Sequence, residues 1–210
     1  MGAGPERVIG ADLDGVVFGR TIEGFFSRIR YMVLRPSPPK HALADIPQLD
    51  HTPVVVSIRN PLEAMSVFFH YRRTAIPGVA EMLRQEIAKG TPVYGISGRR
   101  ATKPWAEMTQ AQLIRENIPL AAVYLTPKGS SGLESKADSI RKLRVTHFYE
   151  DDRRTLLYLA KLFPHVRFNY IDHGLAQLTE KDLAENTNIT VIPITELRRV
   201  RSKEYPYGHI

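Results

Sequence analysis

The hydrophobic pattern alternates between short apolar runs and longer amphipathic segments over the last two thirds of the chain. The short runs predict strands buried on both faces, and the segments between them repeat with the helical period of about 3.6 residues. Strands that alternate with helices predict a parallel sheet joined by right-handed crossovers, which is the α/β class. The expected strands cover residues 8–11, 92–97, 121–126, 145–149 and 166–171, with a last apolar segment at 190–194, and the expected helices cover 77–89, 103–117, 133–143 and 155–163.

Residues 19–72 interrupt this alternation. Apolar residues near the start of the segment recur at helical spacing among arginines, several prolines follow, and Asn60-Pro61 is typical of a helix start. The sequence therefore predicts a core domain of residues 1–18 and 73–210 that carries a small, mostly helical insertion. A basic amphipathic helix can also bind a membrane surface, but such a face packs more often against its own domain.

The composition is that of an ordinary globular protein, with 43% hydrophobic and 24% charged residues. The chain has no cysteine, so disulfides, thiolate nucleophiles and cysteine zinc sites are excluded. No apolar run has the length of a membrane span and the first residues lack the apolar core of a signal peptide, so we expect a cytoplasmic protein. The formal net charge of +7 favours an anionic partner such as a phosphorylated metabolite, a nucleic acid or an anionic membrane surface.

The first predicted strand ends in two carboxylates, Asp12 and Asp14, just before a turn at Gly15. Side chains two positions apart on a strand point the same way, so we expect these carboxylates to converge on one ligand. Two anions held close together repel each other unless a cation or a proton lies between them. The pair therefore predicts a divalent metal site at the carboxyl end of the strand, where open α/β sheets bind ligands. Asp-x-Asp also occurs in calcium loops and sugar-nucleotide sites, and a turn with two solvated aspartates is the structural alternative.

Each of the next three predicted strands also leads into a polar group. Taken singly, these groups have ordinary roles, as a helix cap, as surface lysines and as acids that favour the N-terminus of a helix. Together they place a hydroxyl with a glycine, a lysine and a second acidic group at the same edge of the sheet as Asp12. In chain order they are Ser97-Gly98-Arg99, then Lys128 and Lys136, then Glu150-Asp151-Asp152.

This order of motifs resembles the four motifs of the haloacid dehalogenase superfamily of phosphohydrolases, and the match covers most of residues 7–172. The resemblance implies a three-layer, doubly wound α/β fold in which residues 19–72 form a small cap. It implies that Asp12 is the nucleophile that becomes an aspartyl-phosphate and that Asp14 is the general acid and base. A second carboxylate at position 14 separates the phosphatases and phosphomutases of that superfamily from its dehalogenases.

The resemblance also implies groups that bind the substrate. Ser97, Gly98 and the N–H groups after them would bind phosphoryl oxygens, and Lys136 would neutralise their charge. Lys128 competes with Lys136 for this role, because it also follows the third predicted strand. The candidate substrate contacts beyond the phosphoryl group are Arg99, Arg100 and Lys128.

A Mg²⁺ cofactor is the third implication of the resemblance. The ion would be held by a carboxylate of Asp12, the main-chain carbonyl of Asp14 and the carboxylate of Asp151. Asp152 and Glu150 are the alternatives to Asp151, since the three acids stand in a row. Mg²⁺ suits such a set because it prefers hard oxygen ligands and keeps waters that a phosphate oxygen can replace.

The sequence therefore predicts a Mg²⁺-dependent phosphomonoester hydrolase. Residues 97–100 and 151–153 resemble segments of nucleotidases and polynucleotide 3′-phosphatases, so the expected substrate is a nucleotide, a nucleic-acid end or another small phosphoester. Two alternatives stay open, a non-catalytic nucleic-acid or anionic-surface binding protein on the same fold and a phosphomutase. Phosphate release excludes the phosphomutase, and salt-dependent binding without turnover indicates the binding protein.

Overall fold

The computed structural model describes residues 7–19, 70–175 and 177–199, and within them strands and helices alternate as the hydrophobic pattern predicts. Most of the predicted elements are confirmed to within a few residues. The strands are β1 (Ile9–Ala11), β2 (Val93–Arg100), β3 (Ala122–Thr126), β4 (His147–Glu150), β5 (Arg167–Asp172) and β6 (Ile189–Pro193). The helices are α3 (Pro77–Ala88), α4 (Lys103–Arg115), α5 (Gly132–Leu143), α6 (Arg153–Leu162), α7 (Glu180–Glu185) and α8 (Ile194–Arg199).

The second strand and the short helix α7 differ from the prediction. The pattern predicts that the second strand ends at residue 97, but β2 continues to Arg100, and its register with β3 shifts between Ser97 and Arg100. Ser97 therefore lies inside an irregular strand. The pattern does not predict α7, because this six-residue helix buries none of its residues. Its start carries a signal all the same, since Thr179 and Asp182 form a capping box.

The predicted cap insertion lies outside the described residues, except for its two ends. The core residues on either side of the insertion meet beside the sheet. Phe18 and Ala75 form an antiparallel bridge, and the Ile76 N–H donates to the Val17 carbonyl at 2.9 Å. The chain thus leaves the core after β1 and returns to it at the same place before α3, while the small helical cap itself stays a prediction.

The sheet of the described residues is parallel throughout, and its strand order is β3-β2-β1-β4-β5-β6. The first three strands run outward from β1 to β3, and the chain then crosses back to place β4 on the other side of β1. This is the order of Rossmann-like, doubly wound sheets, and it creates a topological switch point between β1 and β4. Such sheets bind ligands at the carboxyl ends of the strands that flank the switch point.

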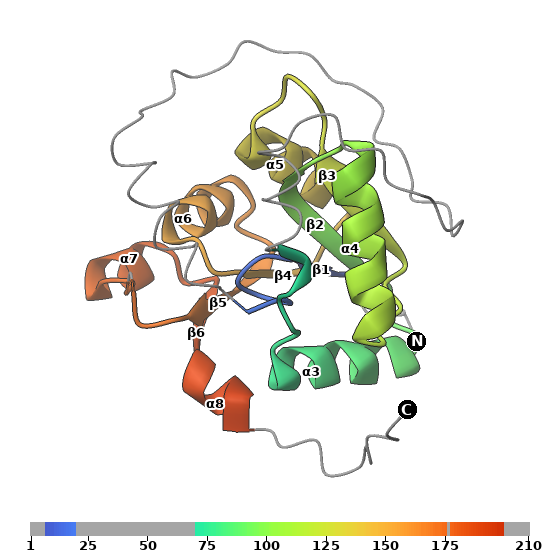
Figure 1. The fold of residues 1–210 in the computed structure, drawn as a ribbon. Helices are drawn as coiled ribbons and strands as arrows, with labels where there is room; N and C mark the ends of the chain where they lie inside the picture. The colour runs from blue at the N-terminus through green and yellow to red at the C-terminus, as the bar shows by residue number, and fades with distance from the viewer. Residues whose placement is uncertain (1–6, 20–69, 176, 200–210) are drawn as a thin grey trace, which may run out of the picture.

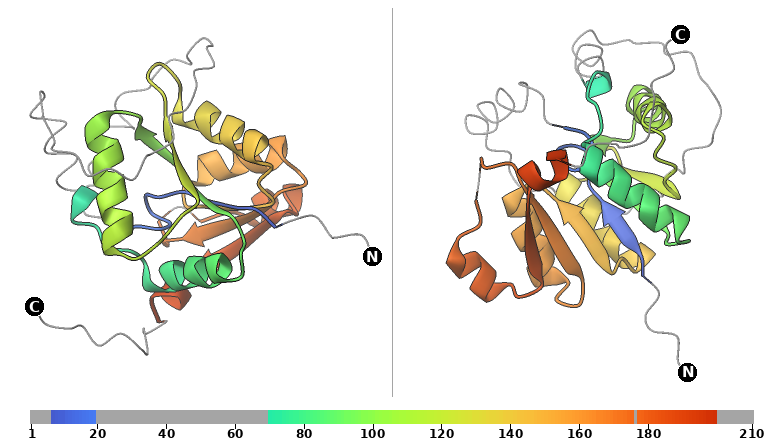
Figure 2. Two further views of the ribbon diagram at one scale, coloured as in Figure 1. Left: turned by 90° about the vertical axis from the view of Figure 1, so that its right-hand side faces the viewer. Right: turned by 90° about the horizontal axis from the view of Figure 1, so that it is seen from below.

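Helices cover both faces of the sheet (Figures 1 and 2). On one face α3 and α8 pack together, and Leu83 and Ile194 belong to the hydrophobic core on that side. On the other face lie α5 and α6, where Ile140 and Leu159 join a second core around Phe148. The α/β class with the sheet as the middle layer is therefore confirmed, and the carboxyl ends of its strands remain available for a site.

Candidate active site

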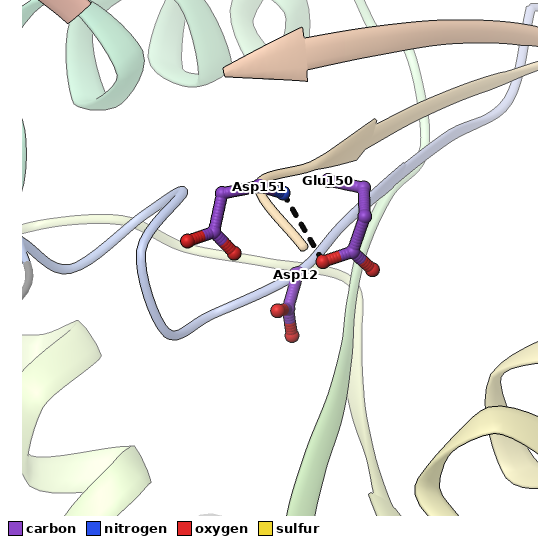
Figure 3. Close-up of side chains that lie close together, drawn as sticks. All are labelled: Asp12, Glu150 and Asp151. Carbon is purple, nitrogen blue, oxygen red and sulfur yellow. Dashed lines mark hydrogen bonds between the residues drawn. The ribbon is translucent and has the colours of Figure 1, made fainter. Parts of the chain in front are cut away.

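Three carboxylates converge at the switch point of the sheet, and we call them the acidic cluster. Asp12 directly follows β1, while Glu150 and Asp151 stand at the end of β4, the neighbouring strand. Each offers a carboxylate oxygen that lies within 4.8 Å of the others, and all three residues are buried. Figure 3 shows these side chains close together although they come from two segments far apart in the sequence. The structure thus brings together acids that follow the first and the fourth strand.

Lys136 contributes one positive charge to the acidic cluster from α5. Its Nζ lies 3.0 Å from Asp12 Oδ2 and 2.6 Å from Glu150 Oε2. A capping box between Ser131 and Glu134 sets the start of α5, and Lys136 follows on the buried side of the helix. Because the ammonium group has little contact with water, these two ion pairs hold it in one position between the carboxylates.

The acidic cluster holds more carboxyl groups than its lysine can keep ionised. Burial raises the pKa of Asp12 to about 8, Lys136 opposes this rise, and Glu150 adds to it. Burial likewise raises the pKa of Glu150, and the charge of Asp151 adds to that rise. The pKa of Lys136 is raised in spite of burial, because Asp12 and Glu150 stabilise its charged form. A second cation would therefore favour the ionised carboxylates.

A hard divalent cation fits the acidic cluster. The cluster offers only oxygen ligands, which Mg²⁺ prefers, and two positive charges would offset the carboxylate charge that Lys136 leaves uncompensated. Among the predicted ligands, Asp12 and Asp151 belong to the cluster. Within the described residues, the side chains of Asp14 and Asp152 do not belong to it.

Asp152 and Glu150 have structural roles at the start of α6. Asp152 is exposed, and its Oδ1 accepts the N–H of Thr155 at 2.9 Å, which makes Asp152 the N-cap of the helix. Glu150 is fully buried, and its Oε1 accepts the N–H groups of Asp151 and Asp152 at 3.1 Å each. Glu150 thus orders the turn that carries Asp151 into the cluster.

Gly15 allows the Asp151 carboxylate to lie against the loop after β1. Its backbone has a φ of +87°, and a Cβ at this position would lie 1.9 Å from Asp151 Oδ2, so only glycine fits. His173 contacts the same loop, with its Nε2 2.6 Å from the Gly15 carbonyl oxygen and 3.8 Å from Asp151 Oδ2. The sequence motifs do not include His173, although its place directly after β5 is a signal that could have found it.

Asp14 binds arginines instead of joining the acidic cluster. Arg99 holds both carboxylate oxygens, with Nε 2.8 Å from Oδ2 and Nη2 2.8 Å from Oδ1, and Arg73 Nη1 lies 2.9 Å from Oδ1. Among the described residues, the Asp14 side chain does not share the metal-ligand cluster of Asp12, because the backbone leaves the extended conformation after Asp12. The convergence of Asp12 and Asp14 on one substrate stays a prediction. The Val17 N–H donates back to the Asp12 carbonyl at 3.3 Å and closes a wide turn. The main-chain carbonyl of Asp14 stays a predicted metal ligand.

Arg99 is held in place by α4. Its side chain is only 2% exposed, and its Nη1 donates to Thr109 Oγ1 at 2.7 Å and to Gln112 Oε1 at 2.9 Å. The guanidinium carbon also lies 5.3 Å from the centre of the Phe18 ring, within the range of a cation–π contact. Although the sequence indicates a substrate contact for Arg99, the structure uses its donors within the protein and gives it the position of a clamp on Asp14.

The arginines keep Asp14 ionised. Burial acts to raise the pKa of Asp14, but Arg99, His70 and Arg73 together outweigh it, and the pKa is held well below its usual range. Asp14 is therefore a carboxylate at neutral pH. The sequence motifs do not include His70 or Arg73, since these residues lie at the end of the predicted insertion and directly after it, and no spacing relates them to Asp14.

Ser97 and Gly98 lie beside the start of α5. Ser97 is buried, and its Oγ accepts a backbone N–H from two residues further along the chain at 3.2 Å. Gly98 is exposed, and a Cβ at Gly132, the first residue of α5, would lie 3.4 Å from the Gly98 Cα. An anion at Gly98 would therefore face the positive end of the helix dipole. Lys128 is exposed in the loop before α5, so Lys136 is the lysine that the structure brings to the acidic cluster.

A pocket of about 260 Å³ opens beside Asp14. Two aromatic rings, two guanidinium groups and one carboxylate form its walls. The rings of His70 and Trp105 meet edge to face with their centroids 4.8 Å apart. Arg100, a predicted substrate contact, is exposed at this pocket. The lining residues are Asp14, His70, Gly98, Arg99, Arg100 and Trp105.

Comparisons of the chain with known proteins identify no family. No protein-family model matches the chain, and no curated protein matches it significantly. In the part of the chain that the structure describes, none of the helices combines the length and the apolar character needed to cross a bilayer. The cytoplasmic location expected from the sequence stays a prediction.

Proposed function

We propose that this protein is a Mg²⁺-dependent phosphomonoester hydrolase in which Asp12 is the nucleophile. The observation that carries the proposal is the position of Asp12 at the end of β1, where it contacts Lys136 and lies within 4.8 Å of the other two carboxylates of the acidic cluster. A nucleophilic carboxylate, a fixed cation for the phosphoryl oxygens and an acidic group for a metal are the parts that this chemistry needs. The resemblance to the haloacid dehalogenase superfamily supports the same assignment.

The proposed reaction consists of two displacements at phosphorus. In the first, Asp12 Oδ forms a bond to phosphorus, the bond to the ester oxygen breaks, and that oxygen takes up a proton to leave as an alcohol. In the second, water attacks the aspartyl-phosphate and gives up a proton, so that inorganic phosphate leaves and the Asp12 carboxylate is restored. The sum is one ester and one water giving one alcohol and one phosphate. When bound, Mg²⁺ would offset the repulsion between the carboxylate and the phosphoryl oxygens.

Asp14 suits the role of a base in the second displacement better than the role of an acid in the first. Arg99 and Arg73 keep its carboxylate ionised, so it can accept the proton that the attacking water loses. The predicted proton transfer to the leaving alcohol needs a protonated Asp14, and Arg99 has to release one oxygen before that oxygen can carry a proton. Arg99 is therefore a positioning residue in the proposed mechanism.

The phosphoryl oxygens would lie between Lys136 and the loop at Ser97 and Gly98. Lys136 is fixed by its ion pair with Asp12, so its positive charge is next to the attacking oxygen before the substrate arrives. The glycine at 98 carries no side chain that would keep an anion away from the backbone N–H groups at the start of α5. These groups would stabilise charge that increases in the transition state.

The test is the hydrolysis of p-nitrophenyl phosphate by the Asp12→Asn variant. Without the nucleophile we expect the release of inorganic phosphate to fall by about 10⁴-fold or more. A chelator should silence the wild-type protein, and added Mg²⁺ should restore it. The matched control is Asp138→Asn on α5, whose side chain is 44% exposed and pairs with Arg141 of the same helix, and it should retain full activity.

Two results would contradict the proposal. Full phosphate release by Asp12→Asn with unchanged circular dichroism would remove Asp12 from the reaction, and full activity in chelator would remove the metal. Transfer of phosphate to a sugar without release would identify a phosphomutase instead. Salt-sensitive binding of RNA or DNA without turnover would identify the non-catalytic alternative.

A further inference from the structure

We propose that the pocket beside Asp14 binds the base of a nucleoside phosphate, so that the leaving group of the reaction is a nucleoside. This inference rests on the proposed function for the direction of the substrate, since it takes Asp12 as the place of the phosphoryl group. It adds a binding site for the rest of the substrate, and Trp105 is the residue on which that site depends.

The pocket adjoins the proposed reaction centre. Asp14 lies two residues beyond Asp12, and Gly98 directly follows Ser97, so two of the lining residues belong to the proposed reaction centre. The pocket continues from them to Arg100 and Trp105. A phosphoester with its phosphorus at Asp12 would therefore extend its leaving group past Asp14 into this pocket.

The walls of the pocket suit a flat aromatic ring. Trp105 is half-buried, and its edge-to-face contact with His70 at 4.8 Å holds the two rings at an interplanar angle of 74°. The guanidinium carbon of Arg99 lies 6.0 Å from the centre of the Trp105 ring, and Arg100 adds an exposed cation. Aromatic and guanidinium faces are the groups on which nucleic-acid bases stack, whatever their sequence.

The same walls offer few acceptors to a simple sugar. Each hydroxyl group of a polyol can donate one hydrogen bond, and guanidinium groups are donors only. Among the described residues, the side chains around this pocket are two aromatic rings, two guanidinium groups and a carboxylate, and Arg99 already donates to both oxygens of that carboxylate on Asp14. Pockets for drug-sized ligands span about 300 to 1,000 Å³, so a volume of about 260 Å³ is the size for one ring system with its sugar at the mouth.

The first experiment uses the fluorescence of Trp105, which is the one tryptophan of the 210-residue chain. The Asp12→Asn variant with Mg²⁺ is titrated with adenosine 5′-monophosphate and, in parallel, with ribose 5-phosphate. A stacked base quenches tryptophan emission, so we expect saturable quenching by the nucleotide and none by the sugar phosphate. Equal responses to both ligands, or no response to either, would overturn the inference.

The second experiment measures phosphate release from the same two compounds by the wild-type protein. We expect a kcat/KM about tenfold or more higher for the nucleotide, since one stacked base commonly accounts for a factor of this size. Trp105→Ala should reduce this ratio towards one, while Trp105→Phe, which keeps a ring, should retain part of it. The matched control Tyr158→Ala removes an exposed ring from α6 and should keep the wild-type ratio.

These measurements separate the failure of the pocket from the failure of the proposed function. Equal hydrolysis of the nucleotide and the sugar phosphate would overturn the pocket and leave the hydrolase intact. Quenching by the nucleotide without phosphate release from any ester would keep the base site and overturn the hydrolase. A trinucleotide with a terminal phosphate tests the source of the base: a higher kcat/KM than for the free nucleotide identifies a nucleic-acid end, and a lower one identifies a free nucleotide, both in agreement with a base in the pocket.

Discussion

Asp12 and Asp14 are two residues apart, yet they belong to regions of opposite charge. Asp12 lies among carboxylates with one lysine, and burial there raises its pKa to about 8. Asp14 lies between two arginines, and its pKa is held well below its usual range against the effect of burial. Environments that push the pKa values of two neighbouring acids apart are typical of sites that divide nucleophilic and proton-transfer roles between them.

The difference between the two regions shows which charge would balance each of them. The acidic cluster has three carboxylates and a single ammonium group, so a dication would complete its charge balance. The region around Asp14 has one carboxylate and two guanidinium groups, so it carries excess positive charge and favours an anion. A phosphate ester bound between them would contact a cation on either side, which agrees with the proposed reaction.

The largest effect is expected from breaking the arginine side of this comparison. Arg99→Gln removes a buried guanidinium from Asp14, and it also leaves Thr109 and Gln112 without their shared donor. We expect the free energy of unfolding to fall by about 3 kcal/mol, at the lower end for a broken buried ion pair because Arg73 still contacts Asp14. Urea denaturation measures the change.

The neighbouring residue supplies the control for this prediction. Arg100 is exposed, so Arg100→Gln should change the free energy of unfolding by less than about 0.5 kcal/mol. Equal losses in the two variants would show that the clamp on Asp14 contributes no stability of its own.

The next largest effect concerns the acidic side, where Gly15 touches Asp151. Gly15→Ala places a Cβ at a φ of +87° and 1.9 Å from Asp151 Oδ2. Gly129 has a similar φ of +91°, but a Cβ there would meet nothing within 4 Å, so Gly129→Ala isolates the backbone strain of about 1 kcal/mol. Gly15→Ala should cost about 2 kcal/mol and displace Asp151 from the cluster.

Thermal unfolding with and without Mg²⁺ checks this prediction. The rise in Tm caused by Mg²⁺ should shrink in Gly15→Ala and stay at the wild-type size in Gly129→Ala. The same Mg²⁺ response in both variants would mean that Asp151 is not needed for the ion.

The sequence predicts much of the fold because the buried strands and amphipathic helices repeat with clear periods. It also predicts that acids after the first and the fourth strand meet, since parallel strands end at one edge of the sheet. It does not predict that the Asp14 side chain lies apart from the acidic cluster, because the period of two applies only while the backbone is extended, and the chain turns back at Val17. Arg73 reaches the site from a distant segment, and local sequence patterns carry no information on such a contact, whereas His173 at least follows a strand end.

The two aspartates should also act on stability in opposite directions as the pH changes. The folded-state pKa of Asp12 is raised, so its contribution is present below pH 4 and is lost as the pH rises towards 8. The folded-state pKa of Asp14 is lowered, so its contribution is present above pH 4 and is lost as the pH falls below that value. In chelator, Tm should therefore decrease between pH 6 and pH 8, and Asp12→Asn should flatten this decrease.

The control for the pH prediction is the same measurement of Tm with added Mg²⁺. Because the ion favours ionised carboxylates, it should raise Tm more at pH 8, where protons are scarce, than at pH 5. A decrease in Tm between pH 6 and pH 8 that is the same in Asp12→Asn and in the wild-type protein would assign the effect to other groups, and the assignment of the raised pKa to Asp12 would be wrong.

The smallest effect distinguishes the two aspartates that follow Glu150. Asp152 caps α6 through its Oδ1, so Asp152→Ala should cost about 1 kcal/mol, whereas Asp152→Asn keeps a capping oxygen and should be nearly neutral. Neither variant should change the Mg²⁺ dependence of Tm, while Asp151→Asn should weaken it, because Asp151, unlike Asp152, has its carboxylate in the acidic cluster. Mg²⁺ titrations of the three variants check this prediction. A loss of Mg²⁺ response in Asp152→Asn, whose cap is intact, would move the metal from the buried carboxylate to the exposed one and would separate the acidic cluster from the ion.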